Sequence, residues 1–172
     1  MIKILGLLLI VGSSTVIGFI YGDGMRKRVR ELKELQRGIY VLKNEINFMQ
    51  SLLPEALVKV SEKCTGSINK IFRTTSDILL KNEEVDVFRS FKKSIEINSK
   101  ILSLTNEDLN IFLDLCKSLG EMDVEGHNDM FNLVSENLNK AINEAESNLD
   151  KNIKMYRFLG FSFGAMVAII LI

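Results

Sequence analysis

The chain has 172 residues with 22 basic and 22 acidic side chains, one Pro, one His, two Cys and no Trp. This length suits one compact domain, and a single Pro favours long helices over a turn-rich β protein. Zero net charge disfavours a non-specific nucleic-acid binder, so no nucleic-acid partner is expected. Cys64 and Cys116 lie too far apart for a zinc motif, and one His gives no metal cluster. We therefore expect no catalytic, cofactor-binding or metal site, and no enzyme activity.

The first predicted element is an uncharged segment over residues 4–22. Its 19 residues are enough for a helix to cross a bilayer. Lys3 before a hydrophobic stretch is also typical of a secretory signal peptide. Because no small-x-small cleavage site follows, we predict an uncleaved transmembrane helix within residues 1–22.

The segments between residues 23 and 157 are predicted to be helical throughout. Apolar residues spaced alternately by three and four continue from the first span to Leu53, and Pro54 then ends this seam. Further helices are expected over residues 54–64, 67–80, 88–102 and 105–119, with Ser67 as a possible N-cap, a capping box at Thr105–Asp108 and a stop at Gly120. A last helix runs from about Asp123 to the C-terminus.

The apolar faces of these helices define the expected core. The first and last helices should run antiparallel as a two-helix stalk, with the short helices folded against it as a cap. The fold class is thus all-α, an antiparallel helical bundle between two terminal transmembrane helices. The predicted core residues are Leu32, Leu35, Ile39, Leu42, Ile46, Met49 and Leu53 in the first helix, Phe72, Phe91, Phe112 and Cys116 in the cap, and Phe131, Val134, Leu138 and Ile142 in the last helix.

The final predicted element is an apolar segment over residues 158–172. Fifteen residues give about 22 Å of helix, short of the roughly 30 Å hydrocarbon core. Met155 and Tyr156 can extend the segment while Lys154 and Arg157 reach the headgroups. The alternative is an amphipathic or buried core helix. Because the segment has little polar face, we predict a second span.

Basic residues flank both spans on the side of the central domain. They are Arg26, Lys27, Arg28 and Arg30 after the first span, and Lys154 and Arg157 before the second. The positive-inside rule then makes residues 23–157 a cytoplasmic domain and the protein a two-span membrane protein. These residues either direct topology alone or also bind anionic headgroups, and both interpretations stay open.

Two further patterns are candidate contact sites. Glycines four residues apart in both spans favour close helix packing, within one chain or in a homo-oligomer, although Gly is common in membrane helices. They are Gly18, Gly22, Gly160 and Gly164. Acidic clusters at helix junctions form a candidate partner rim, or are simply solvated helix ends. They comprise Glu83, Glu84, Asp86, Glu121, Asp123 and Glu125.

The whole layout resembles the stage III sporulation protein AB family of endospore-forming bacteria. The resemblance is carried by an ordered set of short pieces that spans the full length. These are Lys3–Gly6, Gly18–Phe19, Leu42 with Glu45–Ile46, Leu53–Leu57, Leu119–Gly120 with Asp123, Lys154–Tyr156 and Leu159–Gly160.

The resemblance implies a structural platform subunit of the sporulation transport channel in the mother-cell membrane around the forespore. The family is similar to the inner-membrane platform protein of type II secretion. A platform of this kind couples a cytoplasmic ATPase to membrane rings, so the implied partners are the membrane and the other subunits of the stage III sporulation A complex, including its ATPase. The alternative is a two-span regulatory or sensory protein with a helical signalling domain.

Overall fold

The computed structural model describes the backbone of residues 2–49, 51–121 and 124–171, and side chains chiefly within 22–49, 51–119 and 128–149. The described elements are all helices: α1 (Ile2–Asn47), α2 (Leu53–Lys63), α3 (Gly66–Leu80), α4 (Val87–Asn98), a short 3-10 turn (Ser99–Ile101), α5 (Asn106–Glu121) and α6 (Val124–Leu171). The all-α prediction is therefore confirmed. The chain divides into two compact units, residues 28–143 and residues 1–27 with 144–172.

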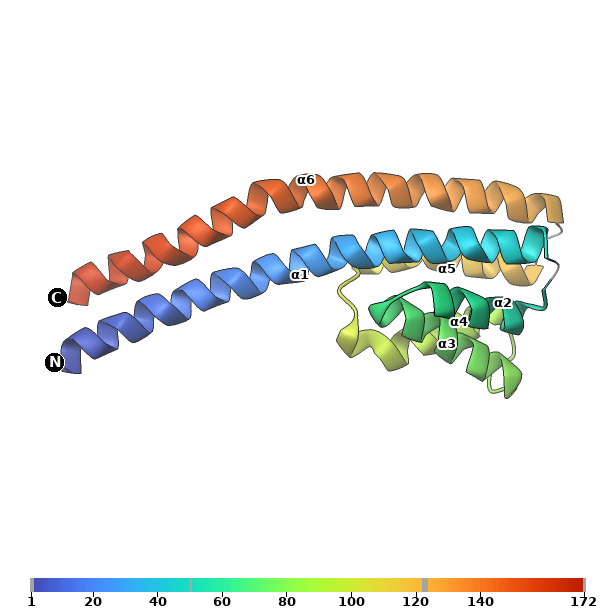
Figure 1. Cartoon of the computed structure of the whole chain (residues 1–172), viewed down its shortest axis with the longest axis horizontal. Coiled ribbons are helices and arrows are strands. Elements are labelled where there is room, and N and C mark those ends of the chain that lie inside the picture. The colour runs from blue at the N-terminus through green and yellow to red at the C-terminus, as the bar shows by residue number, and fades with distance from the viewer. Residues whose placement is uncertain (1, 50, 122–123, 172) are drawn as a thin grey trace. The chain divides into compact units, whose positions relative to one another are not determined.

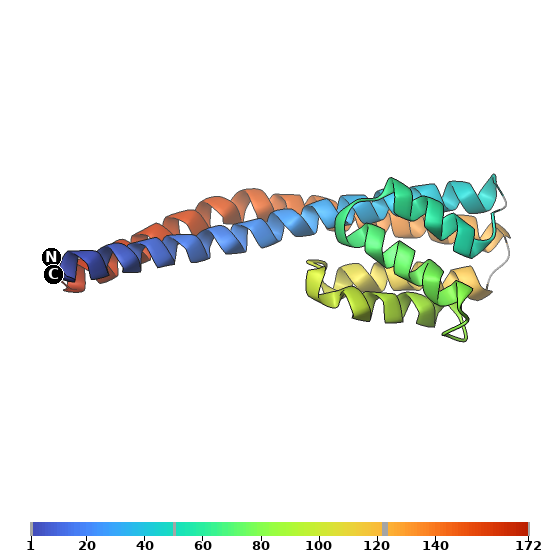
Figure 2. The ribbon, with the colours of Figure 1, turned by 60° about the horizontal axis from the view of Figure 1, so that its bottom comes forward.

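The 28–143 unit is a helical bundle that forms the main core. Figures 1 and 2 show α2 to α5 alongside the second half of α1, and each short helix packs on the next along the chain. In the same unit α1 and the first part of α6 run antiparallel. Hydrogen bonds join Gln36 to Asn139 at 2.6 Å, Lys43 to Asn132 at 2.8 Å and Asn47 to Asn128 at 2.6 Å. The two helices of the predicted stalk thus pair within this unit.

The core of this unit is built from the apolar seam of α1 and the facing stripes of the other helices. Leu32, Leu35, Ile39 and Leu42 recur at helical spacing and are at most 1% exposed. The facing α6 residues Phe131, Val134, Leu138 and Ile142 are buried, as are Ile68, Ile71, Ile78, Ile95 and Leu115 in the short helices. Burial of side chains of this size contributes roughly 1.5–3 kcal/mol each, so this seam is the main source of stability.

Three phenylalanines from three successive helices meet at the centre of this core. The ring centroids of Phe72 and Phe91 are 6.2 Å apart, those of Phe72 and Phe112 5.8 Å, and those of Phe91 and Phe112 5.1 Å. All three pairs meet edge to face, the geometry that the ring quadrupole favours. Each ring is fully buried. The triangle therefore fixes α3, α4 and α5 against one another.

Gly38 allows α1 to approach this ring cluster closely. A Cβ atom at this position would lie 2.5 Å from Cε2 of Phe72 and 3.0 Å from Sγ of Cys64. Ordinary contacts between such atoms are about 3.5–4.0 Å. The missing side chain is thus a packing requirement of the bundle.

Several boundary and core predictions were wrong in detail. The first helix ends at Asn47 rather than Leu53, because the chain turns there into α2, and the buried seam stops accordingly: Met49 is 68% exposed. Thr65, not Ser67, is the N-cap of α3, and the Ser67 hydroxyl bonds a carboxylate instead. The fourth helix stops at Asn98 before a 3-10 turn, and α5 continues one residue past Gly120.

The capping box at Thr105 is confirmed by its geometry. The Thr105 backbone N–H donates to Oδ2 of Asp108 at 2.9 Å, and the Asp108 N–H donates to Oγ1 of Thr105 at 3.2 Å. These reciprocal bonds satisfy two donors at the start of α5.

The other unit comprises the first part of α1 and the last part of α6. Gly22 and Ala145 are buried in it. Within the part of the chain whose side chains the structure describes, no helix has a stretch long and apolar enough to span a bilayer. The predicted spans lie almost wholly outside those residues, and the domain limits drawn at residues 22 and 158 stay predictions.

Candidate interaction surfaces

A buried ion pair joins α1 to the start of α5. Nε and Nη2 of Arg28 donate to the two carboxylate oxygens of Asp108 at 2.8 and 2.9 Å, and the Asp108 side chain is only 2% exposed. Burial alone raises the pKa of Asp108, but hydrogen bonds from Arg28 and Thr105 outweigh it and hold the pKa below its ordinary value. Arg28, one of the basic residues predicted to lie close to the membrane, is thus committed to a carboxylate inside the bundle.

Glu31, one helical turn further on, is a buried carboxylate that the sequence patterns did not single out. It is 4% exposed, and its oxygens accept hydrogen bonds from the Ser67 hydroxyl at 2.5 Å and the Ser103 backbone N–H at 2.6 Å. Glu34 accepts from the Thr65 backbone N–H at 2.7 Å. One face of α1 therefore holds the α2–α3 and α4–α5 connections. The available sequence signal was that Glu31 and Glu34 lie three residues apart on one face of the helix. An ordinary solvent-exposed helix face shows the same pattern, so the spacing did not predict burial.

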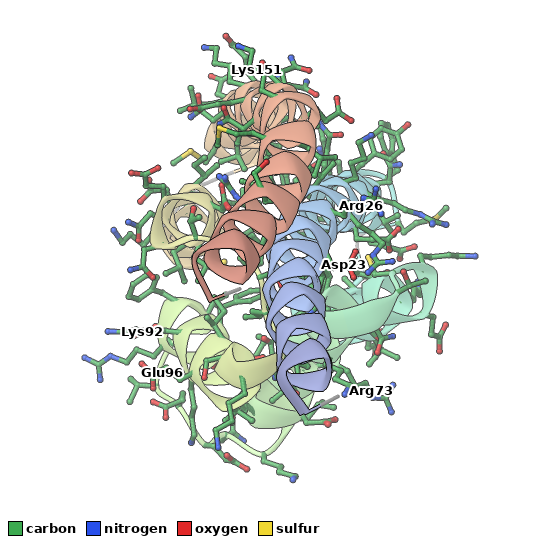
Figure 3. The ribbon with its side chains drawn as sticks, turned by 90° about the vertical axis from the view of Figure 1, so that its left-hand side faces the viewer. Asp23, Arg26, Arg73, Lys92, Glu96 and Lys151 are labelled. Carbon is green, nitrogen blue, oxygen red and sulfur yellow. The ribbon has the colours of Figure 1, made fainter. Side chains whose placement is uncertain are left out.

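The other predicted membrane-proximal residues behave differently. Arg26 lies 3.8 Å from Asp23 one turn earlier, and both are exposed, as Figure 3 shows. Arg30 is exposed and Lys27 is half-buried. The side chains of Lys154 and Arg157 lie outside the described residues. The structure thus leaves headgroup binding by the exposed members as a prediction.

The acidic residues of the α3–α4 connection are gathered together but are paired with nearby cations. Lys93 lies 3.2 Å from Glu83 and 3.1 Å from Glu84, and the hydrogen bonds that its ammonium donates to Glu84 and Glu83 raise its pKa. Asp86 is the N-cap of α4: its side chain accepts from the Arg89 backbone N–H at 2.7 Å and lies 3.4 Å from the Arg89 guanidinium. Much of the negative charge of this cluster is therefore compensated locally.

The remaining candidate residues fall largely outside the described side chains. The side chains of Glu121, Asp123 and Glu125 are not described. Of the four span glycines, burial is described only for Gly22, and not for Gly18, Gly160 and Gly164. The backbone places Glu121 at the end of α5 and Glu125 at the start of α6. Their roles as partner rim and span-packing residues stay predictions.

Exposed apolar side chains at one end of the 28–143 unit were not anticipated. Between α1 and α2, Phe48 is 76%, Met49 68% and Leu52 71% exposed. Leu80, the last residue of α3, is 62% exposed, and Val85, in the connection to α4, is 88% exposed. In Figures 1 and 2 both connections lie at the same end of the bundle. The apolar spacing placed Met49 in the seam of the first helix, so its side chain was predicted to lie in the core rather than on the surface.

The two cysteines and a groove between α5 and α6 offer little for chemistry. Burial raises the pKa of the Cys64 thiol to about 12, and that of Cys116 well above its ordinary value. A shallow groove of about 220 Å³ between α5 and α6 is lined by residues such as Ile111, Lys117 and Leu133. It is smaller than usual ligand sites. The described residues also contain no group of three or more His, Cys, Asp or Glu placed to bind a metal.

Comparison with known proteins gives a consistent identification. The family model described as stage III sporulation protein AB matches residues 3–172. The stage III sporulation protein AB of Bacillus subtilis (strain 168) is 25% identical over 171 residues, which cover 99% of each chain. A solved structure titled stage III sporulation protein AB shares the fold, with a TM-score of 0.66 at 20% identity over 72% of this chain and 96% of the other. Neither name describes an enzyme. The chain therefore belongs to the stage III sporulation protein AB family.

Proposed function

We propose that this protein is a structural platform subunit of the sporulation transport channel. It would stand in the mother-cell membrane around the forespore and couple a cytoplasmic ATPase to membrane rings. The observation that carries this proposal is the family match over residues 3–172, which includes both apolar terminal segments as well as the helical bundle.

The arrangement of helices supports this role. The 28–143 unit has its own core, and α1 and α6 pair antiparallel within it. Each of these helices continues in sequence into one of the uncharged terminal segments. In the proposed topology the bundle is cytoplasmic and both termini lie across the membrane, as the positive-inside rule favours.

Accessibility of single cysteines tests the topology. In a Cys64→Ala/Cys116→Ala background, a cysteine is added after Ile172 or introduced as Ser99→Cys. When the protein is produced in vegetative cells, whose plasma membrane faces the medium, an impermeant maleimide should label the first in intact cells and the second only after lysis. The Cys-free background serves as the control. The reverse labelling pattern would place the bundle outside the cytoplasm and refute ATPase coupling.

Co-purification tests the partner. Full-length protein extracted with mild detergent from sporulating cells should bring down the motor ATPase of the same complex. Recovery of a kinase or response regulator in its place would favour the sensory alternative.

A further inference from the structure

The connection between α4 and α5 lies at the N-terminal end of α1 within the 28–143 unit (Figures 1 and 2). The Ser103 backbone N–H donates to a carboxylate oxygen of Glu31 at 2.6 Å. Just beyond the connection, Asp108 accepts both hydrogen bonds from the Arg28 guanidinium. These contacts hold the connection against residues 28–31 of α1.

The side chains of this connection form an apolar and basic segment. Residues 97–106, which we call the basal segment, hold four aliphatic side chains, one Lys and no Asp or Glu. Ile97 is 60% exposed, and Lys100 is exposed as well. The three half-buried aliphatic residues of the segment are Ile101, Leu102 and Leu104. Aliphatic side chains combined with Lys and without acidic residues suit contact with an anionic membrane surface.

The length of α1 brings this end of the unit close to the predicted first span. Arg28 follows Gly22, the last residue of that span, by six residues, or about 9 Å of helix. The headgroup layer on each side of a bilayer is roughly 5–8 Å thick. A tilt of the helix can only bring Arg28 closer to the hydrocarbon. In the two-span topology the basal segment is therefore within side-chain reach of the headgroups.

We propose that the basal segment rests on the anionic membrane surface and is a third attachment of the protein besides its two spans. The inference rests on the two-span topology of the proposed function. The Lys100 ammonium pairs with lipid phosphates, and the Ile97 side chain enters the interfacial layer. An attachment of this kind restricts tilting of the bundle and fixes which surface it presents to the cytoplasm.

Space and size disfavour a protein as the occupant of this position. In the proposed topology, about 9 Å of α1 separates Arg28 from the hydrocarbon, less than the diameter of one helix with its side chains, about 10–12 Å. A cytoplasmic ATPase therefore cannot enter between the basal segment and the bilayer. A stable contact with a second copy involves roughly 20–30 residues on each side, more than this short segment supplies.

Introduced tryptophan tests the contact, because the chain has no Trp of its own. Full-length Ile97→Trp and Leu102→Trp variants are reconstituted into vesicles of phosphatidylcholine and phosphatidylglycerol, with or without bromine near the carbonyl end of the acyl chains. Since an indole at this depth touches the bromine atoms, we expect both variants to lose emission in the brominated vesicles. The matched control is Val85→Trp, which should keep its emission, because Val85 is 88% exposed in the connection at the other end of α4.

Charge reversal tests the role of Lys100. Lys100→Glu in the Ile97→Trp background should reduce the loss of emission in vesicles that contain phosphatidylglycerol. Lys92→Glu is the matched control, because Lys92 is exposed on α4 about two turns before Lys100. Equal loss of emission with and without Lys100→Glu would overturn the pairing of Lys100 with lipid phosphates.

A further variant, Phe19→Trp in the predicted first span, separates the basal contact from the topology. Unquenched Ile97→Trp and Leu102→Trp beside a quenched Phe19→Trp would overturn the contact and leave the two spans standing. An unquenched Phe19→Trp would overturn both. Quenching of Val85→Trp to the same extent would show the bundle lying along the membrane and overturn the assignment to the basal segment. A blue shift of Ile97→Trp on reconstitution without quenching would assign the segment to a second copy and overturn the choice of lipid.

Discussion

Replacing Gly38 with Ala is expected to destabilise the bundle, although Ala is the better helix former. Within an exposed helix this change gains roughly 1 kcal/mol. At this position the new Cβ would lie 2.5 Å from Cε2 of Phe72, about 1 Å inside ordinary contact distance. Phe72 cannot easily yield, because its ring meets Phe91 and Phe112 edge to face.

The magnitude follows from opposing effects. Overpacking by one methyl group in a close-packed core costs typically about 1–3 kcal/mol. Because the new Cβ would lie 2.5 Å from a ring atom, the upper part of this range applies, about 2–3 kcal/mol. After the gain of roughly 1 kcal/mol in helix propensity, we expect a net loss of about 1–2 kcal/mol. For a unit of this size each kcal/mol shifts the melting temperature by roughly 4 °C. Thermal denaturation of the full-length protein in detergent, followed by circular dichroism at the helical band, should therefore show Tm lower by about 4–8 °C.

Gly24→Ala is the matched control, since Gly24 lies in the same helix and a Cβ atom added there would meet nothing within 4 Å. This variant should melt at or above the wild-type temperature. Trimming the opposing ring with Phe72→Leu should cost less in the Gly38→Ala background than in the wild type, because the two sites are coupled. A Gly38→Ala variant as stable as the wild type would refute the close approach of α1 to the ring cluster.

The remaining predictions concern the buried polar and apolar residues of the same unit. Arg28→Met should lower the free energy of unfolding by about 3 kcal/mol, because it leaves the Asp108 carboxylate buried without its ion-pair partner. This value is near the lower end for such pairs because the Arg28 side chain is 26% exposed, and denaturant titration checks it. The lowered pKa of Asp108 contributes stability that is present above its ordinary value of 3.8 and is lost as pH falls through the lower folded value. Asp108→Asn should therefore flatten the decline of Tm below about pH 4. Cys64 and Cys116 should react with a thiol reagent at pH 8 only after denaturant is added, whereas fast labelling of the native protein would contradict their burial. Leu42→Asp should abolish the cooperative thermal transition, and an unchanged melt would show that the α1 seam is not buried.

Local patterns in the sequence predicted the helices and most of the core, but not the end of α1. The apolar spacing continues through Met49 to Leu53, and nothing in it distinguishes a buried seam from an exposed turn. The capping box at Thr105 was predictable because both of its partners lie within one turn.

Long-range polar partners could not be predicted in this way. Arg28 belongs to a basic run in the sequence, yet its partner Asp108 is 80 residues away. Glu83 and Glu84 form an acidic cluster in the sequence, while the turn into α4 brings Lys93 against both of them. Side-chain charge is visible in a sequence, but the compensation of that charge depends on how the helices pack.

The amide contacts between α1 and α6 restrict how the length of this protein can change in evolution. From Gln36 to Lys43 to Asn47 the α1 position advances by seven and four, while the α6 partner retreats by seven and four from Asn139. Loss of one residue within this stretch would turn every following side chain by about 100° and move the apolar stripe off its neighbour. Insertions and deletions should therefore be confined to the connections between helices, while residues 36–47 and 128–139 keep the same length in related sequences.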